Sequence, residues 1–290
     1  MYFLPFCIHS TRKQFQSNGC LQYISNCIMV VYIGRWLRMD LAAFFKENPV
    51  AALGFSGGVD SSYLLYSALH CGAKIKAYYV RTAFQPQFEL DDAVRLAKQL
   101  GADMAVIETD VLSVPRVAEN PPDRCYYCKT AIFSLIRQHA ADDGYHLLID
   151  GTNASDDAGD RPGILALQEL SIRSPLKECG LRKSDIRRLS REAGLFTWNK
   201  PAYACLATRI PAGTVITEAD LHRIEHAEDS LFAMGFTDFR VRMTGRSAKI
   251  QLPASQMPMA IEKQTEIMEQ LQPEFESVLL DMAGRRNQEI

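Results

Sequence analysis

The chain has 290 residues, of which 47% are hydrophobic and 23% are charged, and its formal net charge at pH 7 is -2. This length is sufficient for one large or two modest domains, and no apolar run reaches the roughly 18 residues of a membrane span. The near-neutral charge argues against the basic surface that binding to long nucleic acids requires. We therefore expect a cytoplasmic protein that acts on a small molecule, with neither a membrane nor a nucleic acid as partner.

The first 38 residues differ in composition from the rest of the chain. They contain four basic residues and no acidic one, whereas the whole chain has 32 basic and 34 acidic residues. We expect residues 1–38 to be a non-native or disordered extension, translated from upstream sequence, with Met39 as the native start. A targeting segment is the alternative.

A strand-to-helix junction near residue 55 gives the strongest functional signal. An apolar run over residues 50–55 predicts a buried parallel strand, and residues 63–70 follow in helical register. The junction between them consists of Ser56, Gly57, Gly58, Val59, Asp60, Ser61 and Ser62. The two glycines leave backbone amides open to phosphate oxygens at a helix N-terminus, and an acidic side chain suits such a place when Mg²⁺ bridges it to the phosphates. The junction therefore predicts a site for a magnesium nucleotide, with a ligand-free turn as the alternative.

The same residues resemble a known phosphate-binding loop. They lack the lysine of the Walker pattern and the glycine spacing of the Rossmann pattern. They are similar to the PP-loop of the ATP pyrophosphatases, which cleave ATP to AMP and pyrophosphate while they adenylate a substrate oxygen. The resemblance implies an adenine nucleotide alpha hydrolase-like fold.

The rest of the chain divides into two parts. The first alternates between helix and strand periods, as a doubly wound parallel α/β sheet requires; it contains expected strands at 74–80, 104–107 and 146–149 and expected helices at 88–100, 126–141 and 183–193. Turn-forming residues over 201–213 end it, so we predict a PP-loop domain over 39–210 and a small α+β domain over 211–290. In the second domain we expect helices at 217–234 and 261–271 and strands at 239–243, 248–252 and 277–280.

The fold class also predicts where the active site lies. Parallel strands bring ligand-binding residues together at their carboxyl ends. This rule places residues 56–62, Arg81 and residues 150–153 on one edge of the sheet.

Three of the eight cysteines lie in reactive-looking surroundings. Cys125 and Cys128 have metal-ligand spacing between Arg124 and Lys129, where a loop enters a predicted helix. Two buried thiols or half of a zinc site is the alternative. Cys205 follows Lys200 and Pro201 and precedes a further arginine, so thiolate character is expected, as a nucleophile that attacks an adenylated carboxyl requires.

Taken together and in order, these motifs resemble the LarE family of ATP-dependent sulfur transferases. The resemblance extends from Met39 to about Leu252 and rests on residues 56–62, 124–129, 150–153, 161–163, 174–176, 200–209 and 240–242. Members of the family convert the carboxylates of pyridinium-3,5-biscarboxylic acid mononucleotide to thiocarboxylates during synthesis of the nickel-pincer nucleotide cofactor.

The resemblance implies roles for individual residues. ATP and Mg²⁺ would bind at Ser56, Gly57, Gly58, Asp60, Ser61 and Ser62, with Asp60 as the Mg²⁺ ligand. Cys205 matches the sulfur-donating cysteine of the family. Arg240 and Arg242 lie one residue apart on a predicted strand and suit a substrate phosphate. Arg209 is a weaker candidate, and a solvated basic face is the alternative for the pair.

The family contains two mechanistic types. In one, a single cysteine gives up its own sulfur and becomes dehydroalanine. In the other, three cysteines similar to Cys125, Cys128 and Cys205 hold a [4Fe-4S] cluster, which leaves one iron free to hold a sulfide. Because this chain has all three cysteines, we predict the cluster type, and we expect a homo-oligomer in which a site could be completed across subunits.

Two departures from the family pattern concern the second domain. Met243 and Thr244 follow the arginine pair where the family often has His before Gly, and Gln251 stands where Glu is frequent. A PP-loop tRNA thiolation enzyme, an amidating PP-loop ligase of the NAD synthetase kind and a nucleotide-binding regulator or iron–sulfur carrier without turnover are the rival hypotheses. The first would need a basic surface, and the amidating ligase would not need the three cysteines.

Overall fold

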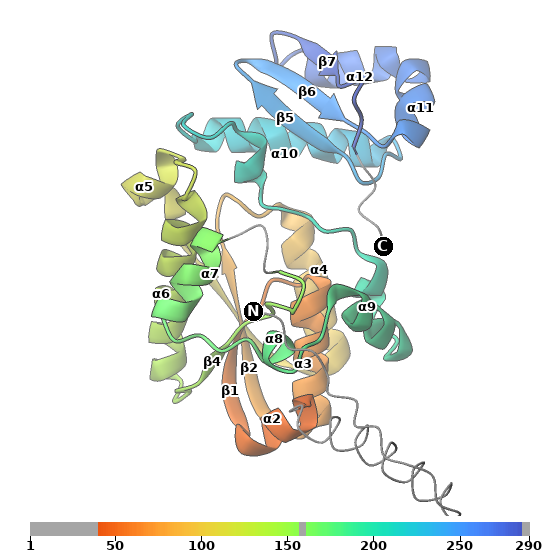
Figure 1. Cartoon of the computed structure of the whole chain (residues 1–290). Helices are drawn as coiled ribbons and strands as arrows, with labels where there is room; N and C mark the ends of the chain where they lie inside the picture. Colours follow the sequence, from red (N-terminus) through yellow and green to blue (C-terminus); the bar gives the residue numbers. More distant parts are fainter. Residues whose placement is uncertain (1–39, 157–160, 286–290) are drawn as a thin grey trace, which may run out of the picture. The chain divides into compact units, whose positions relative to one another are not determined.

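The computed structural model of the chain describes residues 40–156 and 161–285. The expectation for residues 1–38 lies outside these ranges. From Asp40 onward the chain forms one compact unit (Figure 1). None of the helices in the described part of the chain is long and apolar enough to cross a membrane.

The first part of the unit is built on a parallel sheet. Its strands are β1 (Val50–Gly54), β2 (Lys74–Arg81), β3 (Asp103–Glu108) and β4 (Leu148–Ile149), in the order β3-β2-β1-β4. Leu53 in the centre pairs with Ala77 on one side and with Ile149 on the other. The middle of β1 is completely buried, which explains why its sequence is a continuous apolar run instead of an alternating one.

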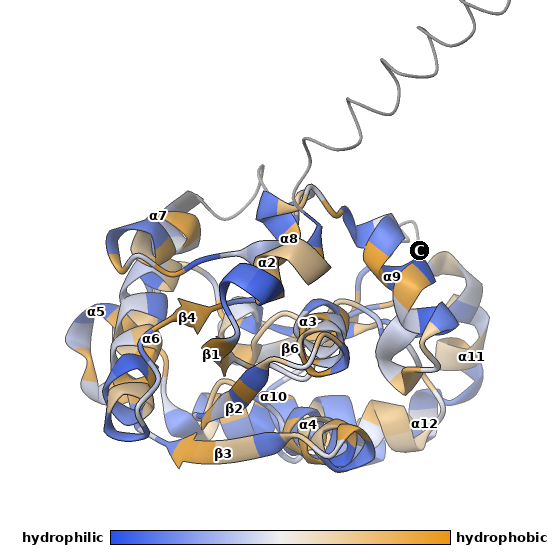
Figure 2. Cartoon of the chain, turned by 90° about the horizontal axis from the view of Figure 1, so that it is seen from below, coloured by the Kyte–Doolittle hydropathy of each residue, from blue (hydrophilic) through white to orange (hydrophobic). Residues whose placement is uncertain are grey.

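Helices cover both faces of this sheet. They are α2 (Leu41–Glu47), α3 (Val59–His70), α4 (Gln87–Leu100), α5 (Pro115–Ala118), α6 (Arg124–Asp142), α7 (Arg161–Glu169), α8 (Pro175–Glu178) and α9 (Lys183–Glu192), with 3₁₀ turns η1 (Val111–Ser113), η2 (Phe196–Asn199) and η3 (Leu206–Arg209). Figure 2 shows α3 and α4 on one side of the sheet and α6 on the other. This is the doubly wound arrangement that the alternating periods predicted.

The second part contains a smaller sheet. It begins with α10 (Glu218–Ala233), whose N-terminus is capped by the side chain of Thr217. Strands β5 (Arg240–Thr244), β6 (Ser247–Gln251) and β7 (Val278–Leu280) form a sheet in that order; β5 and β6 are antiparallel, and β6 and β7 are parallel. The 3₁₀ turn η4 (Ala254–Gln256) and helices α11 (Met257–Glu262) and α12 (Gln264–Leu271) lie between β6 and β7.

One apolar core joins this small sheet to loops of the first part. Phe84 and Val117 follow β2 and β3, and they belong to the same buried cluster as Leu206, Ile224 and Val241. Burial of apolar surface is the main favourable term in folding, so the two parts stabilise each other. The boundary at 210/211 stays a prediction.

The predicted fold class is confirmed, and most element bounds agree within a few residues. The structure differs where the chain has short elements. The expected helix at 261–271 is divided at Lys263 into α11 and α12, and β4 is shorter than the expected 146–149. Helices α5, α7 and α8 were not predicted; α5 and α8 each begin with a proline in the first turn, where its fixed φ suits the start of a helix.

Gly151 provides a test of how closely β4 approaches the start of α3. A Cβ atom at this position would lie 2.9 Å from the backbone nitrogen of Ser61. We therefore expect Gly151→Ala to lower the free energy of unfolding by about 1–3 kcal/mol because backbone must move, as measured by urea denaturation. Gly58→Ala is the control, since its Cβ would meet only the Ser56 hydroxyl at 3.4 Å. Equal midpoints for the two variants would contradict this account.

Candidate active site

The loop between β1 and α3 is held in shape by its own serines. The hydroxyls of Ser56 and Ser61 lie 3.0 Å apart, and Ser61 also donates to the carbonyl of Gly58 at 3.3 Å. Gly57 has a positive φ of 69°, and a Cβ there would lie 2.9 Å from the Cβ of Ala93 in α4. Only glycine combines this backbone conformation with so close an approach. Ser62 is completely buried, and its hydroxyl finds no hydrogen-bond partner within the described ranges.

Asp60 lies in the first turn of α3, and its side chain contacts two residues from distant parts of the chain. Its carboxylate pairs with Lys183 at the start of α9 and accepts a hydrogen bond of 3.4 Å from the amide of Asn153. Burial raises the pKa of this carboxyl, while Lys183 acts in the opposite direction. The side chain of Asp150 is buried and accepts a hydrogen bond of 2.6 Å from the hydroxyl of Ser174. Residues 150–153 therefore meet the loop as predicted.

Arg81 does not join this group. It ends β2 and is exposed, and it donates to Gln87 at 2.9 Å and pairs with Glu108 at 3.6 Å. Arg81 is the last residue of β2 and so lies at the carboxyl edge of the sheet, as predicted, but its side-chain partners are Gln87 of α4 and Glu108 of β3 instead of residues of the loop.

A cavity of about 410 Å³ connects the loop to Cys205. Ser56, Gly58 and Asp60 line one part of it, and Tyr203 and Cys205 line another. Its apolar wall comes from β2 and α6, and consists of Tyr78, Val80, Ile132, Phe133 and Ile136. The lining also includes the charged side chains of Glu89, Lys129, Lys183 and Lys200.

Two of the three predicted cysteine ligands, Cys125 and Cys205, contact the guanidinium of Arg124. One of its nitrogens lies 3.9 Å from the sulfur of Cys125 and 3.8 Å from that of Cys205. Another donates to the side chain of Asn120 at 2.9 Å, and Asn120 donates in turn to the carbonyl of Pro211 at 2.9 Å. The cation is buried, so this anchor fixes its position between the two sulfurs.

The thiols of Cys128 and Cys205 are not activated in the way the sequence predicted. Burial, and after it the neighbouring Cys205, raises the pKa of the Cys128 thiol to about 12. Burial also raises the pKa of Cys205, although Arg124 and Arg209 oppose this. The expectation of thiolate character from nearby cations is therefore wrong for the free protein, because the apolar surroundings of the sulfurs outweigh those cations.

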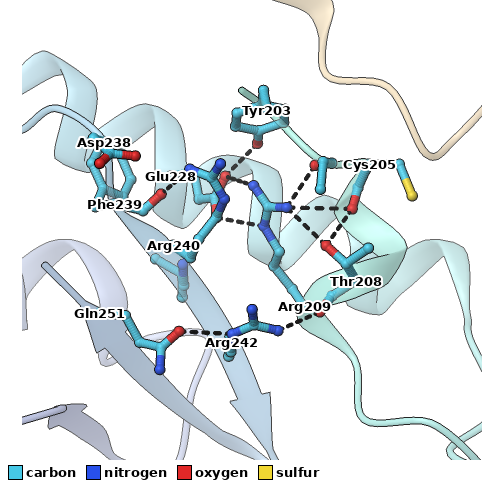
Figure 3. A network of polar contacts seen from close by, with 12 residues as sticks. Tyr203, Cys205, Thr208, Arg209, Glu228, Asp238, Phe239, Arg240, Arg242 and Gln251 are labelled. Atoms are coloured by element: carbon cyan, nitrogen blue, oxygen red, sulfur yellow. Dashed lines mark hydrogen bonds and ion pairs between the residues drawn. The ribbon is translucent and has the colours of Figure 1, made fainter. Parts of the chain in front are cut away.

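A second cationic group lies on the other side of Cys205 (Figure 3). The guanidinium of Arg209 is buried and forms two bonds to Glu228, of 2.9 and 3.0 Å, and it also donates to the carbonyl of Ala204. Arg240 donates to the carbonyl of Ala202, also at the segment that leads to Cys205. In Figure 3 the sulfur of Cys205 points away from these arginines, so they hold its backbone and leave its thiol to the cavity.

The predicted phosphate ligands differ in how available they are. Arg242 is partly buried and donates to the carbonyl of Thr208 at 2.6 Å and to Gln251 at 2.7 Å. Burial, and after it the positive charges of Arg209 and Arg285, lowers the pKa of Arg240 to about 10. To bind a phosphate directly, Arg209 would have to leave Glu228. Its proposed role as a phosphate ligand remains a prediction.

Two lining residues could not be singled out from the sequence. Glu89 is an acid in the first turn of α4, where it looks like an ordinary complement to the helix dipole. Lys183 looks like one of several surface cations on α9. Among the residues that the structure describes, no group of three or more His, Cys, Asp or Glu side chains could hold a metal ion.

The parallel sheet, the glycine turn and the cavity define an α/β protein of the PP-loop type. No family model matches the chain. It is 33% identical over 253 residues to pyridinium-3,5-bisthiocarboxylic acid mononucleotide synthase from Lactiplantibacillus plantarum, a match that covers 86% of this chain and 92% of that protein. An uncharacterized protein of Synechocystis is 35% identical over 226 residues, which is 77% of this chain and 84% of that protein. The chain belongs to the family of this synthase, the LarE family that its motifs indicated.

Arg124 allows a direct test of the environment of Cys205. We expect Arg124→Gln to slow alkylation of Cys205 by iodoacetamide at pH 8 on the order of tenfold, because the variant loses a cation that favours the thiolate. The rate is measured by peptide mass spectrometry on metal-free protein. Arg116→Gln, at an exposed arginine that pairs with Glu119, is the control. Unchanged alkylation in Arg124→Gln would show that the guanidinium does not act on this sulfur.

The buried pair of Arg209 and Glu228 predicts a large effect on stability. Glu228→Gln leaves the guanidinium buried without its counter-charge, and we expect a loss of about 3–5 kcal/mol in the free energy of unfolding. Differential scanning calorimetry would detect it as a lower Tm. Glu192→Gln breaks a pair in which both side chains are 59% exposed and should change stability by no more than about 0.5 kcal/mol. Similar values for the two variants would exclude a structural role for the buried pair.

Proposed function

We propose that this protein is an ATP-dependent sulfur transferase that converts the carboxylates of pyridinium-3,5-biscarboxylic acid mononucleotide to thiocarboxylates, in synthesis of the nickel-pincer nucleotide cofactor. The main support is the single cavity in which the PP-loop and Cys205 face each other. A nucleotide-activated carboxyl and a sulfur nucleophile must meet in this reaction, and the cavity has a place for each. The relative from Lactiplantibacillus plantarum is named for the bisthiocarboxylic acid mononucleotide that this reaction would form, which supports the same conclusion.

ATP is proposed to bind along the loop and the apolar wall. The amides of residues 56–58 and the N-terminus of α3 suit the phosphates. The slot formed by Val80, Ile132 and Phe133 suits a flat, apolar base. Gly54 also lines the cavity next to Phe133, and a Cβ at residue 54 would lie only 2.7 Å from the Phe133 ring. Mg²⁺ would reach the phosphates beside the Asp60 carboxylate, which already lines the cavity.

The proposed chemistry has two steps. A substrate carboxylate attacks the α-phosphorus of ATP, which gives an acyl-adenylate and releases pyrophosphate. Sulfur then attacks the activated carbonyl carbon, and AMP leaves. The cations Lys129, Lys183 and Lys200 line the same cavity and would offset the negative charge of the two reactants and of pyrophosphate.

We propose that Cys125, Cys128 and Cys205 hold a [4Fe-4S] cluster and not a single metal ion, for which the described residues offer no set of three ligands. Each protein ligand of a cluster binds a different iron, so the sulfurs must surround a common space without meeting at one point. The shared contact of Cys125 and Cys205 with Arg124, and the influence of both on the Cys128 thiol, support such an arrangement. When bound, the cluster would supply a sulfide from the iron that lacks a protein ligand. Of the three cysteines, only Cys205 lines the cavity, so Cys205 is the candidate sulfur donor if the protein holds no cluster.

The substrate phosphate is proposed to bind at Arg240 and Arg242. Both arginines have lowered pKa values, chiefly because of burial and then because of neighbouring arginines, and an anion would relieve this repulsion.

We also propose a homo-oligomer. Exposed apolar side chains at Ile261, Leu279 and Met282 in the C-terminal part are suitable contacts for a second copy.

The first experiment separates the two possible sulfur sources. Anaerobically prepared protein is analysed for iron, sulfide and intact mass before and after incubation with Mg-ATP and the pyridinium biscarboxylate. We expect about four irons per chain, unchanged polypeptide mass and a thiocarboxylate product. Loss of the mass of H₂S from Cys205 without bound iron would instead show sacrificial donation.

Cysteine variants complete this test. Cys125→Ser and Cys205→Ser should both abolish iron binding and product formation, whereas Cys71→Ser, at an exposed cysteine outside the site, should change neither. If Cys125→Ser retains turnover, the cluster hypothesis fails. If no substrate releases pyrophosphate from ATP, the proposed function itself fails.

A further inference from the structure

Glu89 is a carboxylate without a partner in the active-site cavity. The other acid that lines the cavity, Asp60, pairs with Lys183, and Lys200 pairs with Asp92 at 2.8 Å. Within the described ranges the side chain of Glu89 forms neither a hydrogen bond nor an ion pair, although it also lines the cavity. A partly buried charge without a partner is costly, so its presence needs an explanation.

Packing places this carboxylate beside the segment that contains Cys205. The ring of Phe88, the preceding residue, meets the ring of Tyr203 edge-on at 5.0 Å. Asp92 lies one turn further along α4 and is the residue that binds Lys200. The first turns of α4 thus contact residues 200–203 at both positions, and Glu89 faces the cavity between them.

The charge of Glu89 is not balanced by the protein. Burial raises its pKa to about 7, and this effect outweighs the cations nearby. The pKa of Glu89 is influenced by the charges of Lys200, Arg209, Asp92 and Arg240. Glu89 in turn raises the pKa of Tyr79. Because the folded protein favours the protonated form, ionisation of Glu89 costs stability as the pH rises toward 7. A bound positive charge would remove this cost.

The reactants narrow the choice of that positive charge. ATP, the two substrate carboxylates and the substrate phosphate are all negative and would be repelled by a carboxylate. Of the positive reactants, Mg²⁺ is proposed to lie beside Asp60 and the phosphates, which leaves the pyridinium nitrogen of the organic substrate. We propose that Glu89 binds the cationic pyridinium ring and so directs a ring carboxylate toward the PP-loop and Cys205. This inference rests on the proposed function and makes Glu89 a specificity residue for a positively charged ring.

The test compares ligands that differ in ring charge. Binding of pyridinium-3,5-biscarboxylic acid mononucleotide and of its neutral 1,4-dihydropyridine form is measured by calorimetry on the full chain at pH 8. We expect Glu89→Gln to weaken binding of the pyridinium compound on the order of tenfold and to leave binding of the neutral form and of Mg-ATP unchanged. Asp91→Asn removes the same charge from an exposed position of α4 and should change none of the three.

The pH dependence gives a second test, because the cation requires the ionised carboxylate. Between pH 6 and pH 8 the affinity of the unmodified protein for the pyridinium compound should rise about tenfold more than that of Glu89→Gln. The variant is the reference because titration of the substrate phosphate affects both proteins equally. Binding near pH 7 should also release a fraction of a proton more with the pyridinium compound than with the neutral form. This measurement needs no variant, so it remains decisive even if Glu89→Gln is poorly folded.

The outcomes are distinguishable. If the unmodified protein does not bind the pyridinium compound, the proposed function fails. If it binds, and Glu89→Gln binds equally well with the same pH profile, the assignment of Glu89 is wrong. Weaker binding of Mg-ATP alone in Glu89→Gln would also overturn it, since the carboxylate would then serve the nucleotide.

Discussion

The contact between the start of α4 and residues 200–203 organises the active site. It consists of the ring pair of Phe88 and Tyr203 and the ion pair of Asp92 and Lys200. Helix α4 also touches the PP-loop, where Ala93 leaves no room for a side chain at Gly57. One helix therefore sets both the shape of the phosphate loop and the position of the segment that leads to Cys205. Loss of either contact would separate the site of activation from the site of sulfur transfer.

Burial determines the chemistry of this site as strongly as the identity of its residues. Flanking cations in the sequence indicated reactive thiols, but the sulfurs lie among apolar groups that favour their neutral forms. The same effect raises the pKa of Asp60 and of Glu89. A cavity of this kind disfavours the charged forms of its acids and thiols until compensating charges enter. It then favours binding of ligands that compensate each charge, which contributes to specificity.

Much of the architecture could be predicted from the sequence because it depends on local patterns. The apolar run before Ser56 and the two glycines after it specify a buried strand and a phosphate turn without reference to the rest of the chain. The side-chain partners of Arg81, Gln87 and Glu108, could not be predicted in this way, because they belong to other elements of the fold. The role of Glu89 depends on a contact with residues more than a hundred positions away. Periodicity has no information about such contacts.

The buried pair of Arg209 and Glu228 has a consequence for how the chain can be divided. Glu228 belongs to α10, beyond the predicted boundary at 210/211, whereas Arg209 supports the carbonyls of Ala204 and Cys205. A fragment that ends near residue 210 would retain the PP-loop and all three cysteines. Its Arg209 would lack a counter-charge, and the backbone of its sulfur-bearing segment would lose its support. Evolution could therefore exchange the small sheet for another domain only if the replacement brought its own carboxylate to this arginine.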